Sequence, residues 1–170
     1  NDKFRLKIYP NKSSILRLNQ KIGDILRKNR SISSYNLIQI LRPIIIGWCN
    51  YYCIYQCSDK FSKLNHSTYQ MLRSWVFRRD KKHGRQVVKE KYFESGNTYT
   101  FRGKKYSDNW VLIGQKKMEN GEVKRNFLPK FTWIKSQKYI KVKDNASIYD
   151  GNHQYWLKRT LQYPNTLPCK

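Results

Sequence analysis

The sequence predicts a mainly α-helical protein with a smaller β-containing part, namely a three-helix bundle followed by a small strand and hairpin unit. Apolar residues recur at helical spacing in three successive segments of the first half of the chain. Beyond about residue 90, aromatic and β-branched residues become frequent, and glycines divide them into short runs. We therefore expect a short extended segment at residues 1–12, a helical domain at residues 13–90 and a small, basic β-containing extension at residues 91–170.

The extended segment and the first helix follow from two different periodicities. Within residues 1–12, apolar residues alternate with charged ones, which is typical of an extended chain. Ser13 or Ser14 is the expected N-cap of the first helix. The apolar stripe of this helix consists of Ile15, Leu18, Ile22, Ile25 and Leu26. Another face of the same helix carries three basic residues: Arg17, Lys21 and Lys28.

The second helix is expected to start near Tyr35, because the serine-rich residues 31–34 supply N-cap side chains. Pro43 lacks a backbone donor, so we expect it to kink or restart this helix. The predicted core face follows helical spacing through Leu41, Ile45, Trp48 and Tyr52.

The third helix is expected to begin at a cap formed by Ser58 or Asp59 and to stop at Gly84. Its apolar stripe consists of Phe61, Leu64, Thr68, Met71, Leu72 and Trp75. Farther along the chain, Asn120-Gly121 predicts a hairpin with a type I′ turn. Residues 139–143 alternate like a half-exposed strand.

The charge of the chain points to a polyanionic partner. Lys and Arg together number 35 and Asp and Glu 11, which gives a net charge of +24. Such charge is self-repulsive in a folded domain, and nucleic acid is its usual partner, with an anionic membrane surface as the alternative. Aromatic residues make up 15% of the chain, so rings that can stack on bases are abundant. No stretch reaches the roughly 18 apolar residues of a membrane span, so we expect no membrane insertion.

The sequence contains no pattern typical of a metal site or a catalytic centre. The first three cysteines are spaced along one helical face, so their thiols cannot converge on one metal, and we interpret them as reduced, buried groups: Cys49, Cys53 and Cys57. The three histidines have no paired nucleophile within motif range: His66, His83 and His153. Asp150-Gly151 is interpreted as a turn. We expect no enzyme activity in this chain, no cofactor and no metal.

Residues 44–52, IIIGWCNYY, place an amide and two tyrosines beside the most apolar segment of the chain. We expect Gly47 to let a neighbouring backbone approach closely and Trp48 to anchor the packing between helices. Asn50 and Tyr51 lie off the apolar stripe, so we predict that they contact the riboses, bases or phosphates of RNA. The alternative is that the whole segment belongs to the core.

A second candidate surface is a run of eight basic residues between residues 73 and 91, against which stand only Asp80 and Glu90. In a chain of this charge, such a run at a helix end predicts a surface that contacts phosphates. The alternative is an ordinary solvated face.

Three stretches in fixed order, LRPIIIGWCNYY, Phe61-x-x-Leu64 and SWVFRRDKKH, resemble the maturase-specific region (domain X, or thumb) of group II intron-encoded proteins. In that family a Gly-Trp-x-Asn-Tyr-Tyr step leads to a Phe-x-x-Leu helix, which ends in a Trp and an Arg-Arg-His cluster. FRLKIYPNKSS and KYIKVKDNASIYDGNHQYW are similar to the segments before and after the thumb, so the resemblance covers about residues 4–157. It implies a thumb-like helical bundle that binds RNA.

The chain also departs from this family. An Asp-Lys-Lys insertion at residues 80–82 separates Arg79 from His83, and Ile148 stands where the family has proline. The reverse-transcriptase palm, with its Tyr-x-Asp-Asp pair, and the endonuclease elements are absent from this sequence. The candidate RNA-binding residues are Arg17, Lys21, Lys28, Asn50, Tyr51, Arg73, Arg78, Arg79, Lys81, Lys82, His83, Arg85, Lys89 and Lys91.

Our first hypothesis is that the protein is an RNA-binding maturase domain, which docks on structured group II intron RNA and assists its folding and splicing. One alternative is a structural subunit of a larger organellar ribonucleoprotein, such as a ribosome, bound to ribosomal RNA. Another is the C-terminal part of a split reverse transcriptase, with a palm-domain protein as its partner. Lys, Asn, Ile and Tyr all have AT-rich codons, so their heavy use suggests an organelle, either plastid or mitochondrion.

Overall fold

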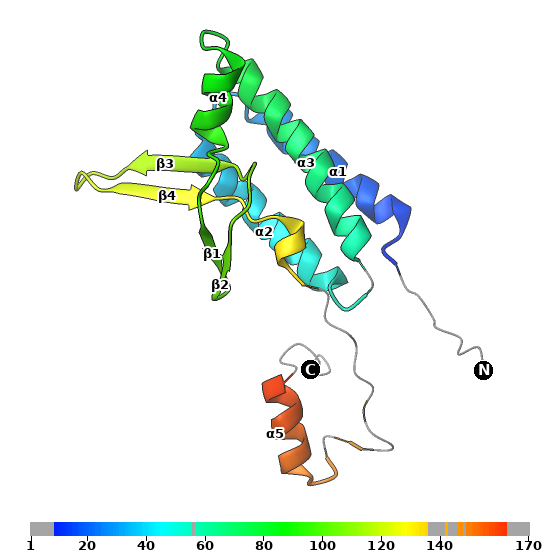
Figure 1. Ribbon diagram of the computed structural model, residues 1–170. Helices are drawn as coiled ribbons and strands as arrows, with labels where there is room; N and C mark the ends of the chain where they lie inside the picture. Colours follow the sequence, from blue (N-terminus) through cyan, green and yellow to red (C-terminus); the bar gives the residue numbers. More distant parts are fainter. Residues whose placement is uncertain (1–8, 56, 136–141, 143–145, 148, 163–170) are drawn as a thin grey trace. The chain divides into compact units, whose positions relative to one another are not determined.

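The computed structural model describes residues 9–55, 57–135, 142, 146–147 and 149–162, and it divides into two compact units, Asn1–Ser136 and Gln137–Lys170 (Figure 1). The predicted mainly α-helical fold with a small β part is confirmed. Most of the expected extended segment at residues 1–12, and the expected strand at residues 139–143 apart from residue 142, lie outside the described residues.

The first unit begins with three long helices, as the three apolar stripes predicted: α1 (Lys12–Lys28), α2 (Ser34–Tyr52) and α3 (Ser58–Arg79). Helices α1 and α3 lie side by side and point the same way (Figure 1), since Ser67 of α3 donates a hydrogen bond to Asn19 of α1 at 3.1 Å and Trp75 donates to the carbonyl of Asn29 at 3.0 Å. One hydrophobic cluster joins the buried faces of all three helices.

The helix ends differ from the sequence prediction in three of four places. The N-cap of α1 is Asn11, whose side chain accepts a hydrogen bond from the Ser13 amide, so the expected serine cap is wrong. Helix α3 has Cys57 at its N-cap and no side-chain cap, and it ends before Gly84 is reached. Gly84 is instead the N-cap of α4 (Arg85–Tyr92). The predicted cap of α2 is confirmed, because Ser33 accepts from the Asn36 amide at 3.2 Å.

Helix α2 continues through Pro43 without restarting, which corrects the expected interruption. A proline removes a single backbone donor, and here it lies on an exposed side of the helix, so the remaining hydrogen bonds and the packing maintain the helix. The buried face of α2 includes Leu41, Ile45 and Cys49, whereas Trp48 and Tyr52 of the predicted core face are only partly buried.

The cysteines do not share one helical face, because α2 ends at Tyr52. Cys49 belongs to α2, Cys53 is its C-cap, and Cys57 is the N-cap of α3. All three thiols are buried, as predicted, and burial raises the pKa of each above the ordinary value for cysteine. They therefore serve as small apolar groups where α2 turns into α3.

Two antiparallel hairpins follow α4: one joins β1 (Tyr99–Phe101) to β2 (Lys104–Tyr106), and the other joins β3 (Ile113–Lys117) to β4 (Val123–Phe127). The hairpin predicted at Asn120-Gly121 is present, but its turn is not type I′. The Met118 amide donates to the Glu122 carbonyl at 2.8 Å, and within residues 118–122 only Gly121 has a positive φ, of 82°. The connection is thus a longer loop that ends in a left-handed glycine.

The hairpins share the hydrophobic cluster of the helices. Strand β3 packs against α2, where a Cβ at Gly114 would collide with the backbone of Tyr35. A short 3-10 turn, η1 (Phe131–Trp133), places the Trp133 ring against Tyr106 of β2, with centroids 4.7 Å apart. Phe101 and Leu128 belong to the same cluster as the helix residues. The segment between α4 and residue 135 is therefore part of one core with the helices.

The second unit contains α5 (His153–Gln162) and the turn before it. The Asp150 carboxylate accepts hydrogen bonds from the amides of Ser147, at 3.0 Å, and Asn152, at 2.9 Å. The bond from Asn152 is the main cause that lowers the pKa of Asp150 below the ordinary value. The turn predicted at Asp150-Gly151 is confirmed, with Gly151 at φ 73°. Across the described residues of both units, no helix is long and apolar enough to cross a membrane.

Candidate nucleic-acid interface

The first candidate surface is a groove between α1 and α2, here called the α1–α2 groove. Arg17 and Lys21 line it from α1, and Trp48, Tyr51 and Tyr52 line it from α2. In the sequence they belong to two separate sets, the basic face of the first helix and residues 44–52, and the structure brings them to one site. A groove that combines cations with aromatic rings suits single-stranded nucleic acid, since the cations follow the phosphates while the rings stack on bases.

Tyr51 presents the most accessible ring of this groove. Its side chain is 68% exposed, and its ring meets Tyr52 edge-on, with centroids 4.8 Å apart. Tyr52 in turn lies against Trp48 at 4.4 Å. Trp48 also contacts Phe61 and Phe131, so the series of rings runs from the core to the surface. The prediction that Tyr51 projects toward solvent agrees with this geometry.

Gly47 has a different role from the one expected. A Cβ at this position would meet no atom within 4 Å, so no backbone approaches it closely. Gly47 instead lines the α1–α2 groove, together with the residues that supply the cations and the rings. The absence of a side chain here keeps the groove open.

Asn50 is exposed beside Tyr51, but its amide oxygen is already engaged. It accepts a hydrogen bond of 2.9 Å from the guanidinium of Arg102, which lies at the turn of the β1–β2 hairpin. Arg102 was not among the predicted residues. Nothing local in the sequence marks it, because its partner lies far away along the chain.

The second candidate surface is a groove between the C-terminal ends of α1 and α3, here called the α1–α3 groove. Among the residues that the structure describes, no carboxylate lines it, whereas five cationic residues do: Arg27, Arg30, Arg78, Arg79 and Lys81. Arg27 is paired with Asp24 of its own helix. Within the described part of the chain, Arg30, Arg78 and Lys81 have no ion pair. The sequence prediction missed Arg27 and Arg30; their only signal was their place at the basic end of the first helix.

Arg79 has a structural contact as well as a place in this groove. Its guanidinium donates to the carbonyl of Ile32, in the loop between α1 and α2, and lies over the Trp75 ring at 5.3 Å. Trp75 itself bonds to the carbonyl of Asn29 in the same loop. Arg79 and Trp75 therefore attach the end of α3 to this loop.

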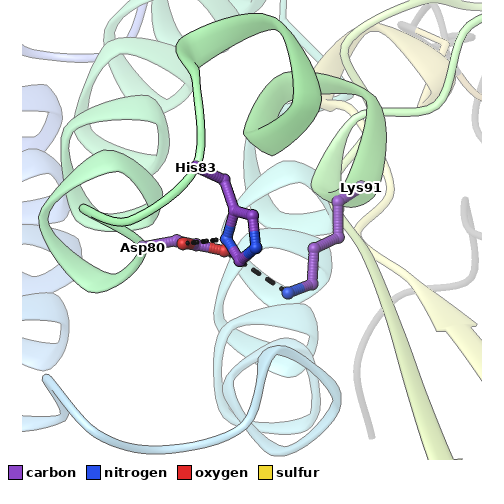
Figure 2. A network of polar contacts seen from close by, with 3 residues as sticks. All are labelled: Asp80, His83 and Lys91. Atoms are coloured by element: carbon purple, nitrogen blue, oxygen red, sulfur yellow. Dashed lines mark hydrogen bonds and ion pairs between the residues drawn. The ribbon is translucent and has the colours of Figure 1, made fainter.

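The loop between α3 and α4 contains the Asp-Lys-Lys insertion, and Asp80 organises it (Figure 2). Its carboxylate is bonded to His83 Nδ1 at 2.7 Å and to Lys91 Nζ at 3.4 Å, and its side chain is only 11% exposed. The hydrogen bond to His83, followed by that to Lys91, lowers the pKa of Asp80. Two of the predicted RNA-binding residues, His83 and Lys91, are thus bonded within the protein, while Lys81 and Lys82 remain exposed.

The remaining predicted residues lie outside both grooves. Lys28 is exposed in the last turn of α1, and Arg73 is exposed over the Phe77 ring at 5.3 Å. Arg85 is exposed at the start of α4, and Lys89 is half-buried in its last turn. Their contact with RNA stays a prediction.

No group of three His, Cys, Asp or Glu side chains among the described residues could hold a metal ion. Comparison with protein families matches residues 15–93 to the family described as group II intron, maturase-specific domain. The matched range includes the Asp80 loop, the α1–α3 groove and every lining residue of the α1–α2 groove except Ser14, and it ends before the hairpins. A comparison with curated proteins finds no match to the chain.

Proposed function

Residues 15–93 form a group II intron maturase-specific domain, and from this premise we propose that the chain binds structured group II intron RNA and assists its folding and splicing. The matched region is the maturase-specific part of such proteins and not their catalytic palm. In this proposal the RNA performs the splicing chemistry, and the protein supplies binding energy that favours the splicing-competent RNA fold.

The observation that best supports this proposal is the α1–α3 groove. Its five cations come from two helix ends, and like charges gathered this closely repel one another unless an anion lies between them. The carbonyl ends of α1 and α3 offset part of this repulsion. RNA phosphates would offset the rest and would release counterions on binding, which favours association.

The two grooves suit different parts of an RNA. The α1–α3 groove and the exposed lysines of the Asp80 loop offer charge without exposed rings, which fits a phosphate backbone. The α1–α2 groove adds the exposed Tyr51 ring to Arg17 and Lys21, which fits an unpaired segment whose bases are accessible. A folded intron presents both features.

Binding isotherms of the full chain with a group II intron RNA, measured at several salt concentrations, test the charge contribution. We expect the double variant Arg30→Ala, Arg78→Ala to lower the log–log salt slope by roughly one unit per lost phosphate contact. The matched control is Lys116→Ala, Lys124→Ala, which removes the same charge from the exposed β3–β4 hairpin. Equal effects of the two variants would contradict a specific role for the groove.

Splicing needs a separate measurement, because binding alone does not distinguish a maturase from a structural RNA-binding subunit. We expect the full chain to accelerate splicing of a group II intron RNA at limiting Mg²⁺, and the Arg30, Arg78 double variant to accelerate it less. Tight, salt-dependent binding without any acceleration would favour the structural subunit.

A further inference from the structure

A pocket lies where α2 and α3 meet the segments that flank the β3–β4 hairpin. Its volume is about 200 Å³, and it shares no lining residue with the α1–α2 or the α1–α3 groove. The apolar part of its wall is formed by buried side chains from both halves of the first unit: Ile45, Leu72, Leu112, Leu128 and Phe131. Neither the matched family region nor the RNA-binding proposal assigns this pocket a role.

Thr68 of α3 also lines the pocket, and its hydroxyl has no hydrogen-bond partner in the described part of the chain. The residue is only 4% exposed. A buried hydroxyl without a partner destabilises the fold, and such groups are rare in native proteins. The oxygen itself has less than 1 Å² of accessible surface, so a ligand with a polar edge would satisfy it once the Thr68 side chain rotates toward the pocket, whereas a purely aliphatic side chain would leave it unpaired.

Trp110 stands at the same pocket in a strained conformation. Its φ is 63°, in the left-handed region that non-glycine residues adopt at an energetic cost, and 53% of its surface is exposed. Its ring is stacked on Tyr69 with centroids 5.1 Å apart and planes 17° apart. Tyr69 is supported in turn by an edge contact with Phe93 at 5.3 Å. The backbone is therefore strained at a residue that presents a large, exposed aromatic ring beside an apolar pocket, and the contact with Tyr69 positions that ring.

Two polar residues of the rim are bonded to neighbouring residues. The Asn65 side chain accepts from the Phe131 amide and donates to the Thr132 hydroxyl, both at 2.8 Å. Lys130 is paired with Asp108 at 3.3 Å. These bonds hold the wall in place. Ser62, His66 and Tyr69 add further polar atoms to the rim, and Thr68 has the hydroxyl of this wall that is both buried and without a partner among the described residues.

We infer that this pocket takes one unpaired nucleobase of the bound RNA, an inference that rests on the proposed RNA-binding function. A nucleobase combines a flat π face, suited to Trp110, with a polar edge, suited to Thr68. The pocket is smaller than the roughly 300–1,000 Å³ of sites for drug-sized ligands, so a single ring system fits its size. The net charge of +24 favours a nucleic acid over a protein as the source of that ring.

The test uses the full chain with the Tyr51→Ala substitution, so that the exposed ring of the α1–α2 groove does not contribute a stack. The probe is a short RNA that is abasic except for one central 2-aminopurine, and it is compared with the fully abasic RNA. We expect the base-bearing RNA to bind about 5- to 150-fold more tightly, the scale of one base–aromatic stack, with quenched 2-aminopurine fluorescence. In this background, Trp110→Ala should remove the preference, whereas Trp110→Phe in its place should keep most of it.

Thr68→Val provides the second variant, and it separates function from folding. Because valine replaces an unpartnered buried hydroxyl, we expect the melting temperature to stay the same or rise while the preference for the base-bearing RNA falls several-fold. If the preference survives both Trp110→Ala and Thr68→Val, the inference is wrong, and a protein side chain becomes the better candidate for the pocket. If even the fully abasic RNA fails to bind with a salt-dependent affinity, it is the RNA-binding proposal itself that fails.

Discussion

Arg102 and Asn50 are 52 positions apart in the sequence and are joined by a hydrogen bond of 2.9 Å between guanidinium and amide oxygen. This bond ties the β1–β2 hairpin to the end of α2, directly beside the exposed Tyr51. The hairpin lies beyond the matched maturase-specific residues, yet it supports a residue within them. Asn50 therefore positions part of the protein, whatever contact it also makes with RNA.

Loss of this bond should destabilise the chain slightly. Because the bond is exposed, we expect Arg102→Ala to lower the free energy of unfolding by about 0.5–1.5 kcal/mol. Lys105→Ala removes the same charge from the same hairpin, with no hydrogen bond to lose among the described contacts, and should have almost no effect. Urea unfolding of both variants measures the difference. Equal stabilities would show that the bond contributes nothing.

Tyr51→Ala should weaken binding to intron RNA by about 1–3 kcal/mol, the scale of one lost stack on a base. The fold should remain intact because the ring is exposed, and the salt slope should hardly change because no cation is removed. Trp48→Ala is the structural comparison. Since Trp48 is partly buried, it should cost about 2–3 kcal/mol of stability, below the cost for a fully buried ring. Unfolding of the Tyr51 variant would place that ring in the core.

Gly47→Leu should fill the α1–α2 groove without disturbing the fold. Open space surrounds the position, and leucine favours a helix over glycine by about 0.5–1 kcal/mol, so the melting temperature should stay the same or rise. RNA affinity should nevertheless fall, because the new side chain would occupy space in the groove that the cations and the rings line. Gly47→Ala, with a much smaller side chain, should lose less. A stable Gly47→Leu variant with unchanged affinity would exclude this groove from the interface.

Gly114→Ala should be destabilising by about 1–3 kcal/mol, because the added Cβ would collide with the backbone of Tyr35 and push β3 away from α2. Gly84→Ala is the matched control. It lies in open space at an ordinary negative φ and should cost about 0.5–1 kcal/mol, because alanine is less favourable than glycine at an N-cap but meets no clash. Thermal unfolding distinguishes the two variants, and equal melting temperatures would contradict the close approach of β3 to α2.

The lowered pKa of Asp80 predicts how stability depends on pH. A carboxylate whose pKa falls on folding stabilises the protein above its unfolded pKa of about 3.9, and that stability is lost as the pH drops through the lower folded value. Asp80→Asn should therefore be less stable than the wild type at neutral pH and should lose less stability on acidification. Urea midpoints from neutral to strongly acidic pH provide the measurement. The control is Glu119→Gln, which removes a carboxylate from the exposed β3–β4 turn. Identical pH profiles for Asp80→Asn and the wild type would be inconsistent with the contacts of Asp80 to His83 and Lys91.

The sequence by itself determined the three long helices, the hairpin at Asn120-Gly121 and the stripe from Phe61 to Trp75 on the buried face of α3. Helical spacing and turn residues act between residues that are close in the chain, so a pattern within a few turns is enough to predict these elements, although not where each helix ends. The exposure of Tyr51 followed from the same reasoning, because the residue lies off the apolar stripe.

Only the tertiary structure decided which faces meet. It joined Arg17 and Lys21 to Tyr51, brought Arg27 and Arg30 beside Arg78, and placed the hairpins in the core of the helices. It also assigned Gly47 to an open groove and Gly114 to a close contact, two roles that the sequence alone does not distinguish. These relationships depend on pairings between residues far apart in the chain, and no local periodicity encodes such pairings.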